Sequence, residues 1–140
     1  MKLSARNVFK GTVASVKKGA VNTEVILNLG CCSIASTITN TSADSLGLAA
    51  GKEAFAMIKA SSIIIGTDVD AAKVSARNVI CGTVSKVIEG PVSAEVDLAV
   101  GGNYTLTAII TADSAKKLGL KEGGKACAII KASSVIMGVD

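Results

Sequence analysis

A Val or Leu stands at every second position along two stretches of the chain, 24–29 and 95–100, and most residues between them are polar. Successive side chains of a β-strand point to opposite faces, so this period of two predicts strands with one buried face. The stretch 8–16 is rich in β-branched residues and predicts a longer strand, with Gly11 as a bulge within it. The first half of the chain is therefore expected to begin with two strands joined by a turn or loop at 19–22.

Glycines mark the turns that follow these strands. Gly30 and the segment 101–103 are typical of hairpin turns and predict a third strand in each half, ending near Thr39 and Thr111. Each third strand leads into a short helix. In the second half we expect this helix over 112–118.

Both helices carry the start and stop residues that such a helix needs. Thr111 is the expected N-cap of the second helix and Gly119 its stop, while the first half repeats this arrangement between 39–41 and Gly47. In the first half, a fourth strand is predicted over 54–59 and a short fifth over 63–65. Five strands with one helix between the third and the fourth is the element order of an OB-like barrel.

The chain repeats itself. The motif Ser-Ala-Arg-Asn-Val at 4–8 recurs at 75–79, and Lys-Ala-Ser-Ser at 59–62 recurs at 131–134. Such self-similarity indicates a tandem duplication. We predict an all-β chain of two tandem OB-like five-stranded barrels, each with one short helix. The expected division is a first unit at 1–68, a linker at 69–72 and a second unit at 73–140.

Composition narrows the class of protein. Apolar residues make up 49% of the 140 residues, but Phe9, Phe55 and Tyr104 are the only aromatic side chains, so Val, Ile, Leu and Ala must build the core. No apolar run is long enough to span a bilayer, and the first residues lack the apolar stretch of a signal peptide. A cytoplasmic protein with no membrane contact is expected. The dispersed net charge of +4 favours a small anion over a long polyanion as partner.

The cysteines do not predict a metal site. The chain has four of them, without a Cys-x-x-Cys pair and without any histidine, which fits no usual zinc spacing. No cysteine recurs at the matching position of the other half. Buried or incidental thiols are the expected role, and no metal cation is expected; the residues concerned are Cys31, Cys32, Cys81 and Cys127.

Three segments that recur in both halves carry the candidate chemistry. They are Ser-Ala-Arg-Asn before the first strand, a Thr after the third strand and Lys-Ala-Ser-Ser after the fourth, and all lie at strand ends. Together they offer guanidinium and ammonium groups, hydroxyls and backbone amides, with no carboxylate inside the segments. Such donors suit a doubly charged oxyanion. The alternative for each residue taken singly is a structural role, such as Arg6 and Arg77 pairing with nearby carboxylates on the surface.

The loops after the first strand of each half are weaker candidates for anion binding through exposed amides. A plain strand connection is an equally good interpretation of them, and Pro91 removes one amide donor from the second loop. The candidate residues in these loops are Gly19, Val21, Asn22, Gly90, Val92 and Ser93.

Taken in order, these segments resemble the molbindins, proteins built from Mop domains. The matching pieces are Ser-Ala-Arg-Asn at 4–7, Gly11, the segment 19–25, Leu-Gly-Leu at 46–48 and Ile-Lys-Ala-Ser at 58–61. The resemblance covers nearly the whole chain, and the two-unit order is similar to a di-Mop molbindin. The family implies OB-like barrels, a trimer of two-unit chains, and molybdate or tungstate held at contacts between subunits, without an organic cofactor.

The same resemblance implies intracellular storage or homeostasis of molybdate and assigns ligands by position, with Ala60 and Ala132 acting through their backbone. It does not choose between the two anions, or between storage, buffering and delivery. The implied oxyanion-binding sets are Ser4, Arg6, Thr39, Lys59, Ala60 and Ser61 in one copy, and Ser75, Arg77, Thr111, Lys131, Ala132 and Ser133 in the other.

Three other functions fit the sequence less well. A nucleic-acid-binding OB module would stack bases on aromatic side chains in a basic groove, and this chain has few aromatics and a mild charge. A molybdate-responsive regulatory module acting on a partner would need another protein, because the chain has neither a P-loop nor a separate DNA-binding segment. An enzyme is not expected, since there is no histidine and no nucleophile motif.

Overall fold

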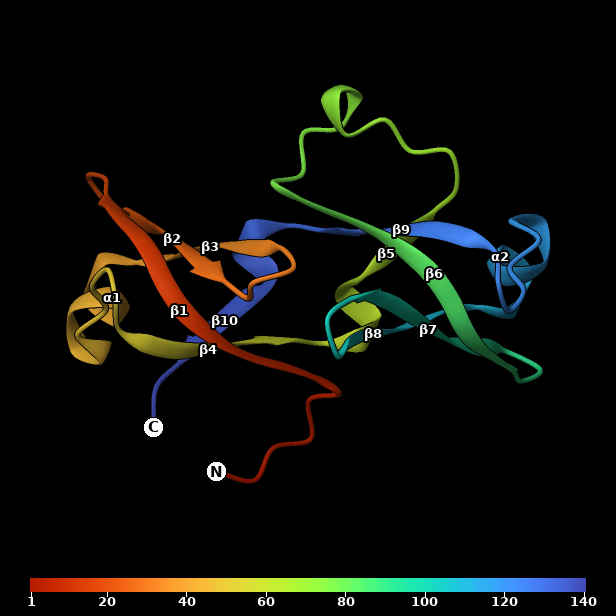
Figure 1. The fold of residues 1–140 in the computed structure, drawn as a ribbon, viewed down its shortest axis with the longest axis horizontal. Coiled ribbons are helices and arrows are strands. Elements are labelled where there is room, and N and C mark those ends of the chain that lie inside the picture. The colour runs from red at the N-terminus through yellow and green to blue at the C-terminus, as the bar shows by residue number, and fades with distance from the viewer.

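The computed structural model describes all 140 residues and is dominated by strands, which form two curled five-stranded sheets side by side (Figure 1). The predicted all-β class with OB-like units is confirmed. The elements of the first half are β1 (Asn7–Lys18), β2 (Asn22–Asn28), β3 (Ser33–Thr39), α1 (Asn40–Leu46), β4 (Glu53–Ile58), η1 (Ala60–Ser62) and β5 (Ile64–Gly66). Those of the second half are η2 (Ala71–Lys73), β6 (Asn78–Glu89), β7 (Ser93–Gly101), β8 (Tyr104–Thr111), α2 (Ala112–Lys117), β9 (Lys125–Ile130), η3 (Ala132–Ser134) and β10 (Val135–Gly138).

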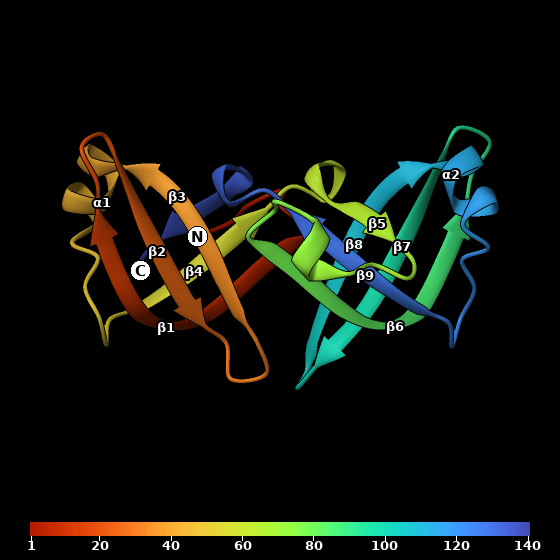
Figure 2. The same cartoon turned by 90° about the horizontal axis from the view of Figure 1, so that it is seen from above.

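The two halves exchange their last strands. One sheet has the order β10-β4-β1-β2-β3 and the other β5-β9-β6-β7-β8, with all neighbours antiparallel. Figure 2 shows β10 crossing to the sheet of the first half and β5 crossing to that of the second. The sequence division into 1–68, 69–72 and 73–140 remains a prediction, and the exchange means that neither segment completes a sheet alone.

The alternating pattern becomes the buried face of each sheet. Val25 and Leu27 on β2 are fully buried, as are Val96 and Leu98 on β7, while their neighbours along the strand face outward or are half-buried. These side chains belong to one cluster of 22 buried residues that includes strands of both halves. A single core therefore joins the two sheets. None of the helices is long and apolar enough to cross a membrane.

The predicted bulge at Gly11 is wrong. Gly11 pairs regularly with Ala54, and the register of β1 against β2 shifts between Val13 and Ser15 instead. Glycine is needed at position 11 because a methyl group there would lie 2.4 Å from the carbonyl oxygen of Asn28. The backbones of β1 and β2 approach too closely for a side chain.

Gly82 on β6 has the same role, with even less room. A methyl group there would lie 2.1 Å from the carbonyl oxygen of Ala99. We expect Gly82→Ala to lower the free energy of unfolding by roughly 1–3 kcal/mol, because neighbouring backbone must move to admit it. Denaturant unfolding measures this change. The exposed Thr105→Ala on β8 is the control, and equal effects of the two substitutions would contradict the steric argument.

The helix caps form as predicted. The hydroxyl oxygens of Thr39 and Thr111 accept hydrogen bonds from the amides of Ser42 and Ser114, both at 3.1 Å. Gly47 and Gly119 follow the helices with φ of 60° and 62°. The second helix ends one residue earlier than predicted, and both threonine hydroxyls are already used to begin a helix.

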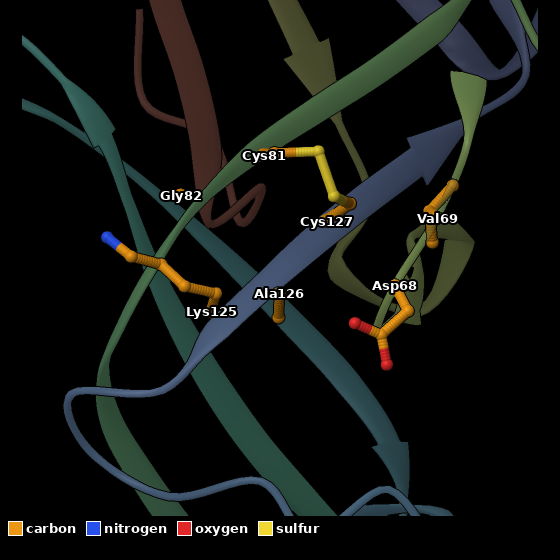
Figure 3. Close-up of a pocket in the computed structure, with 7 residues that line it drawn as sticks. All are labelled: Asp68, Val69, Cys81, Gly82, Lys125, Ala126 and Cys127. Atoms are coloured by element: carbon orange, nitrogen blue, oxygen red, sulfur yellow. A yellow bond between two sulfur atoms is a disulfide. The ribbon is translucent and has the colours of Figure 1, made fainter. Parts of the chain in front are cut away.

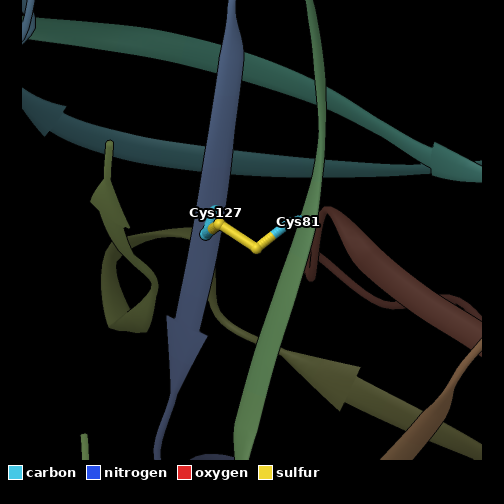
Figure 4. Close-up of a disulfide and its surroundings, with 2 residues drawn as sticks. All are labelled: Cys81 and Cys127. Carbon is cyan, nitrogen blue, oxygen red and sulfur yellow. A yellow bond between two sulfur atoms is a disulfide. The ribbon is translucent and has the colours of Figure 1, made fainter. Parts of the chain in front are cut away.

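Two cysteines form a disulfide, so the expectation of four thiols is wrong for Cys81 and Cys127 (Figure 4). They face each other directly in the register between β6 and β9. The sequence gives no sign of this pairing, because the two residues are far apart in the chain and have no cysteine counterparts in the first half. The disulfide also lines a pocket of about 450 Å³ with Asp68 and Lys125 (Figure 3).

Candidate functional site

A pocket of about 410 Å³ opens where the chain enters β1 and leaves β4. The antiparallel register pairs Asn7 with Ile58, so the residues before β1 and those after β4 must converge. The pocket is lined by apolar side chains together with five of the predicted oxyanion ligands, which are Ser4, Arg6, Lys59, Ala60 and Ser61. One guanidinium, one ammonium and two hydroxyls thus border one cavity.

The Lys-Ala-Ser part of this pocket is a single tight turn. The amide of Ser62 donates to the carbonyl oxygen of Lys59 at 2.9 Å and closes η1. Amides at the start of such a turn have no partner within it and remain donors for another group. Ala60 is buried, so only its backbone can take part, which suits the role predicted for it.

The second half repeats the arrangement of strands. Asn78 pairs with Ile130, so Ser75 and Arg77 before β6 lie near the turn of η3 after β9. Within this turn the amide of Ser134 donates to the carbonyl oxygen of Lys131 at 2.9 Å, as in the first copy. The predicted ligands in this turn are Lys131, Ala132 and Ser133.

Within one chain, Thr39 lies apart from the set that the family resemblance implies for it. Thr39 does not line the pocket of Ser4 and Arg6; it lines another pocket, of about 430 Å³, together with Ser133 of the opposite half. In the same way, Ser61 lines a pocket with Ser114 of the opposite half. The amide of Ser114 donates to the hydroxyl oxygen of Thr111, the N-cap of α2. The strand exchange explains this regrouping, because η3 packs on β3 and η1 packs on β8.

Both arginines are held by carboxylates from the opposite half. Nη1 of Arg6 lies 2.6 Å from Oε1 of Glu95, and the guanidinium of Arg77 donates two hydrogen bonds to Glu24. The alternative interpretation of both arginines, pairing with carboxylates, is thus what the structure shows. The sequence analysis did not name the partners, although Glu24 and Glu95 recur at matching positions of the repeat. The arginine side chains remain half exposed. Since a guanidinium has five N–H donors, each keeps donors for a further anion.

These ion pairs lower the pKa of Glu24 and Glu95, mainly through the hydrogen bonds from Arg77 and Arg6. A carboxylate with a depressed pKa stabilises the fold above its ordinary pKa, and this contribution is lost as the pH falls through the folded-state value. We expect Glu24→Gln/Glu95→Gln to be less stable than the parent at neutral pH and to lose less stability on acidification. Denaturant unfolding of both proteins, from neutral pH to below the ordinary glutamate pKa of 4.5, measures the difference. An equal loss of unfolding free energy in the two proteins on acidification would contradict the expectation.

The weaker candidate loops are already bonded internally. The amide of Gly19 donates to the carbonyl oxygen of Asn22 at 2.8 Å, and that of Gly90 to Ser93 at 2.9 Å. Their glycine amides therefore serve the hairpin turns. At the loop tips Val21 and Val92 are 72% and 78% exposed. The structure places these loops beside the helix starts, because the amides of Asn40 and Ala112 donate to the two valine carbonyls.

Two further recurrent residues have a role that the sequence left unassigned. Asn7 and Asn78 are buried, and each side chain bonds to the backbone of the third strand of the opposite half. Their presence in both copies of the Ser-Ala-Arg-Asn motif was a usable signal. They hold in place the segments that precede β1 and β6 and that carry Arg6 and Arg77. The motif therefore combines a structural asparagine with a candidate ligand.

Fold and pockets together define a class of tandem OB-like proteins in which cationic and hydroxyl side chains gather at strand ends. Residues 3–65 and 74–137 match the TOBE domain. The chain belongs to the TOBE domain family and carries two copies of that domain, and the resemblance to the molbindins is confirmed.

Relatives cover the whole chain. It is 46% identical over 140 residues to the molybdenum transport protein ModE of Azotobacter vinelandii, and 43% identical to the molybdenum-pterin-binding protein MopA of Rhodobacter capsulatus. These matches span 99% of this chain but 52% and 53% of those proteins, so the chain spans about half the length of the curated relatives it matches. A solved structure of the cytoplasmic molybdate-binding protein ModG with molybdate bound is 50% identical, with a TM-score of 0.96 and full coverage of both chains.

Proposed function

We propose that this chain binds molybdate or tungstate in the cytoplasm and serves to store the anion and hold its concentration steady. The observation that carries the proposal is the pocket in which Ser4, Arg6, Lys59 and Ser61 meet. A structural relative of equal extent, half identical in sequence, contains bound molybdate and is described as cytoplasmic. The expected role as a binding protein agrees with relatives named as binding proteins.

The donors suit a tetrahedral dianion that keeps its four oxygens. Arg6 offers N–H groups beyond those bonded to Glu95, Lys59 supplies a compact positive charge, and the serines and turn amides supply neutral donors. Because no step forms a bond to the metal atom, selection against sulfate rests on the size of the cavity and the placement of donors. Phosphate carries a proton near neutral pH and needs an acceptor for it, whereas no carboxylate lines this pocket.

We further propose that the pocket is completed by another copy of the chain in a homotrimer. Its rim carries Leu3, Ile109 and Ile136, which are 47%, 39% and 62% exposed. Apolar side chains gathered at a polar pocket are typical of a surface that a partner covers. An anion bound there would have contacts with two chains, so molybdate should stabilise the oligomer.

A nucleic-acid partner has little support in this surface. Phe9 and Phe55 are buried, and Tyr104 packs edge-on against Phe9 while its hydroxyl donates to the carbonyl oxygen of Lys10. Binding of single strands requires exposed aromatic faces on which bases stack. We therefore propose no nucleic-acid partner, and a salt-sensitive gel shift would reverse this judgement.

Equilibrium dialysis against molybdate, with metal analysis of the retained protein, tests the proposal. Arg6→Ala/Arg77→Ala should weaken binding roughly ten- to hundredfold, because each substitution removes charge-assisted hydrogen bonds. Lys73→Ala/Lys121→Ala removes the same net charge at exposed positions and should leave affinity within about twofold. Equal affinities of all three proteins for molybdate, or the absence of uptake by the parent, would count against the assignment.

A further inference from the structure

The tip of the β2–β3 hairpin carries two adjacent free cysteines, Cys31 and Cys32. Their sulfur atoms lie 3.5 Å apart, and the Cys31 thiol donates to Sγ of Cys32. The turn that holds them is closed, because the amide of Leu29 donates to the carbonyl oxygen of Cys32 at 2.9 Å and Gly30 adopts a φ of 92°. The backbone thus holds both thiols on one short loop, side by side.

The two thiols differ in their surroundings. Cys31 is exposed, whereas Cys32 is half-buried against the hydrophobic core. Burial raises the pKa of Cys32 to about 11. The Cys32 thiol is therefore mostly protonated at neutral pH, which slows its reaction with simple alkylating agents, since the thiolate is the nucleophile. A reagent that bonds both sulfurs at once gains from their fixed proximity instead.

We propose that Cys31 and Cys32 form a binding site for trivalent arsenic, held by two sulfur bonds to one arsenic atom. Trivalent arsenic is pyramidal, and bonds of about 2.3 Å to each of two sulfurs, the length of a zinc–thiolate bond, would place them roughly 3.5 Å apart at an angle of about 100°. The observed 3.5 Å is close to this span. The structure groups no third Cys, Asp or Glu ligand that would favour a tetrahedral metal ion.

The reaction balances without an oxidant or a reductant. An arsenoxide, R–As=O, reacts with the two thiols to form two As–S bonds and one molecule of water. The oxygen leaves with both thiol protons, and arsenic stays trivalent. Neither cysteine lines the pockets proposed for the oxyanion, so this site is separate from the proposed molybdate function.

The hairpin tip of the other half lies against this site. A methyl group at Gly101 would lie 3.3 Å from Cβ of Cys31, so glycine at that position leaves room for the cysteine. The site exists once per chain, because glycine and not cysteine occupies the matching hairpin of the second half. Tyr104, the only tyrosine of a chain without tryptophan, lies beside Gly102 and reports changes here by its fluorescence.

The test uses phenylarsine oxide with the 140-residue chain. Cys81→Ala/Cys127→Ala is purified under a phosphine reductant, so that Cys31 and Cys32 are the only thiols and both are reduced. Intact-mass measurement should show one adduct per chain, heavier by the arsenical less one water, together with a change in tyrosine fluorescence. A dithiol, 2,3-dimercaptopropanol, should remove the adduct, whereas an equal excess of the monothiol glutathione should not.

Matched substitutions in the same background locate the adduct. Cys31→Ser and Cys32→Ser should each reduce the stable adduct at least tenfold, because either one leaves a single sulfur. A stable adduct in the variant lacking both cysteines would overturn the proposal. Removal of the adduct by glutathione as readily as by the dithiol would also overturn it. The same holds if reduced Cys81→Ala/Cys127→Ala fails to bind one phenylarsine group per chain.

Discussion

Replacing Asn7 with Ala should lower the free energy of unfolding by roughly 3–5 kcal/mol, a large share of the stability of a small domain. The Asn7 side chain is fully buried and donates to the carbonyl oxygens of Ile58 and Thr107 at 3.2 and 2.8 Å. It also accepts from the amide of Thr107 at 2.7 Å. Truncation leaves these backbone groups buried without a partner and opens a cavity.

The second half provides an internal replicate of this experiment. Asn78 is 2% exposed and forms the corresponding pair of bonds with the backbone of Ala35, both at 2.8 Å. Asn78→Ala should therefore destabilise the chain by a similar amount. The exposed Asn103→Ala at a hairpin turn is the control, with an expected change within about 0.5 kcal/mol. Equal losses of unfolding free energy in urea for the buried and the exposed variants would contradict the stabilising role of these asparagine hydrogen bonds.

The strands and helices were largely predictable because local signals decide them. Alternation of Val and Leu with polar residues located β2 and β7, and the threonine and glycine caps located both helices. The convergence of Arg6 with Lys59 was also within reach, since the ends of antiparallel neighbours in an OB-like order meet. These features depend on residues close in sequence or on the order of elements.

Features that depend on which sheet a strand joins were not predictable from the sequence. The fifth strands of the two halves, 63–65 and 135–137, are both short and apolar, so either could complete either sheet. The structure shows that the two halves exchange these strands. With this arrangement Thr39 lies in one pocket with Ser133, and Arg6 pairs with Glu95. A repeat comparison aligns equivalent residues but does not tell which copies lie together.

Cutting the chain between the halves should abolish folding of either half as a monomer. In the fragment 1–70, β4 would lose its hydrogen-bonded neighbour β10, and the core would lose Val135 and Met137, which are 2% and 5% exposed. Buried side chains of this kind each contribute about 1.5–3 kcal/mol, which together is comparable to the whole stability expected for a unit of this size. The fragment would also expose Ile65, which is buried in the other half.

The isolated fragment should therefore be unfolded at low concentration or form a dimer in which each copy supplies the missing strand to the other. Circular dichroism and native mass spectrometry distinguish these states from a folded monomer. Mixing with 71–140 should restore the strand signal of the intact chain. A 71–140 fragment with Met137→Asp should fail to restore it, because a charge would enter the core, whereas one with Asp140→Ala at the exposed end should succeed. A folded monomer of 1–70 would show that the strand exchange is dispensable.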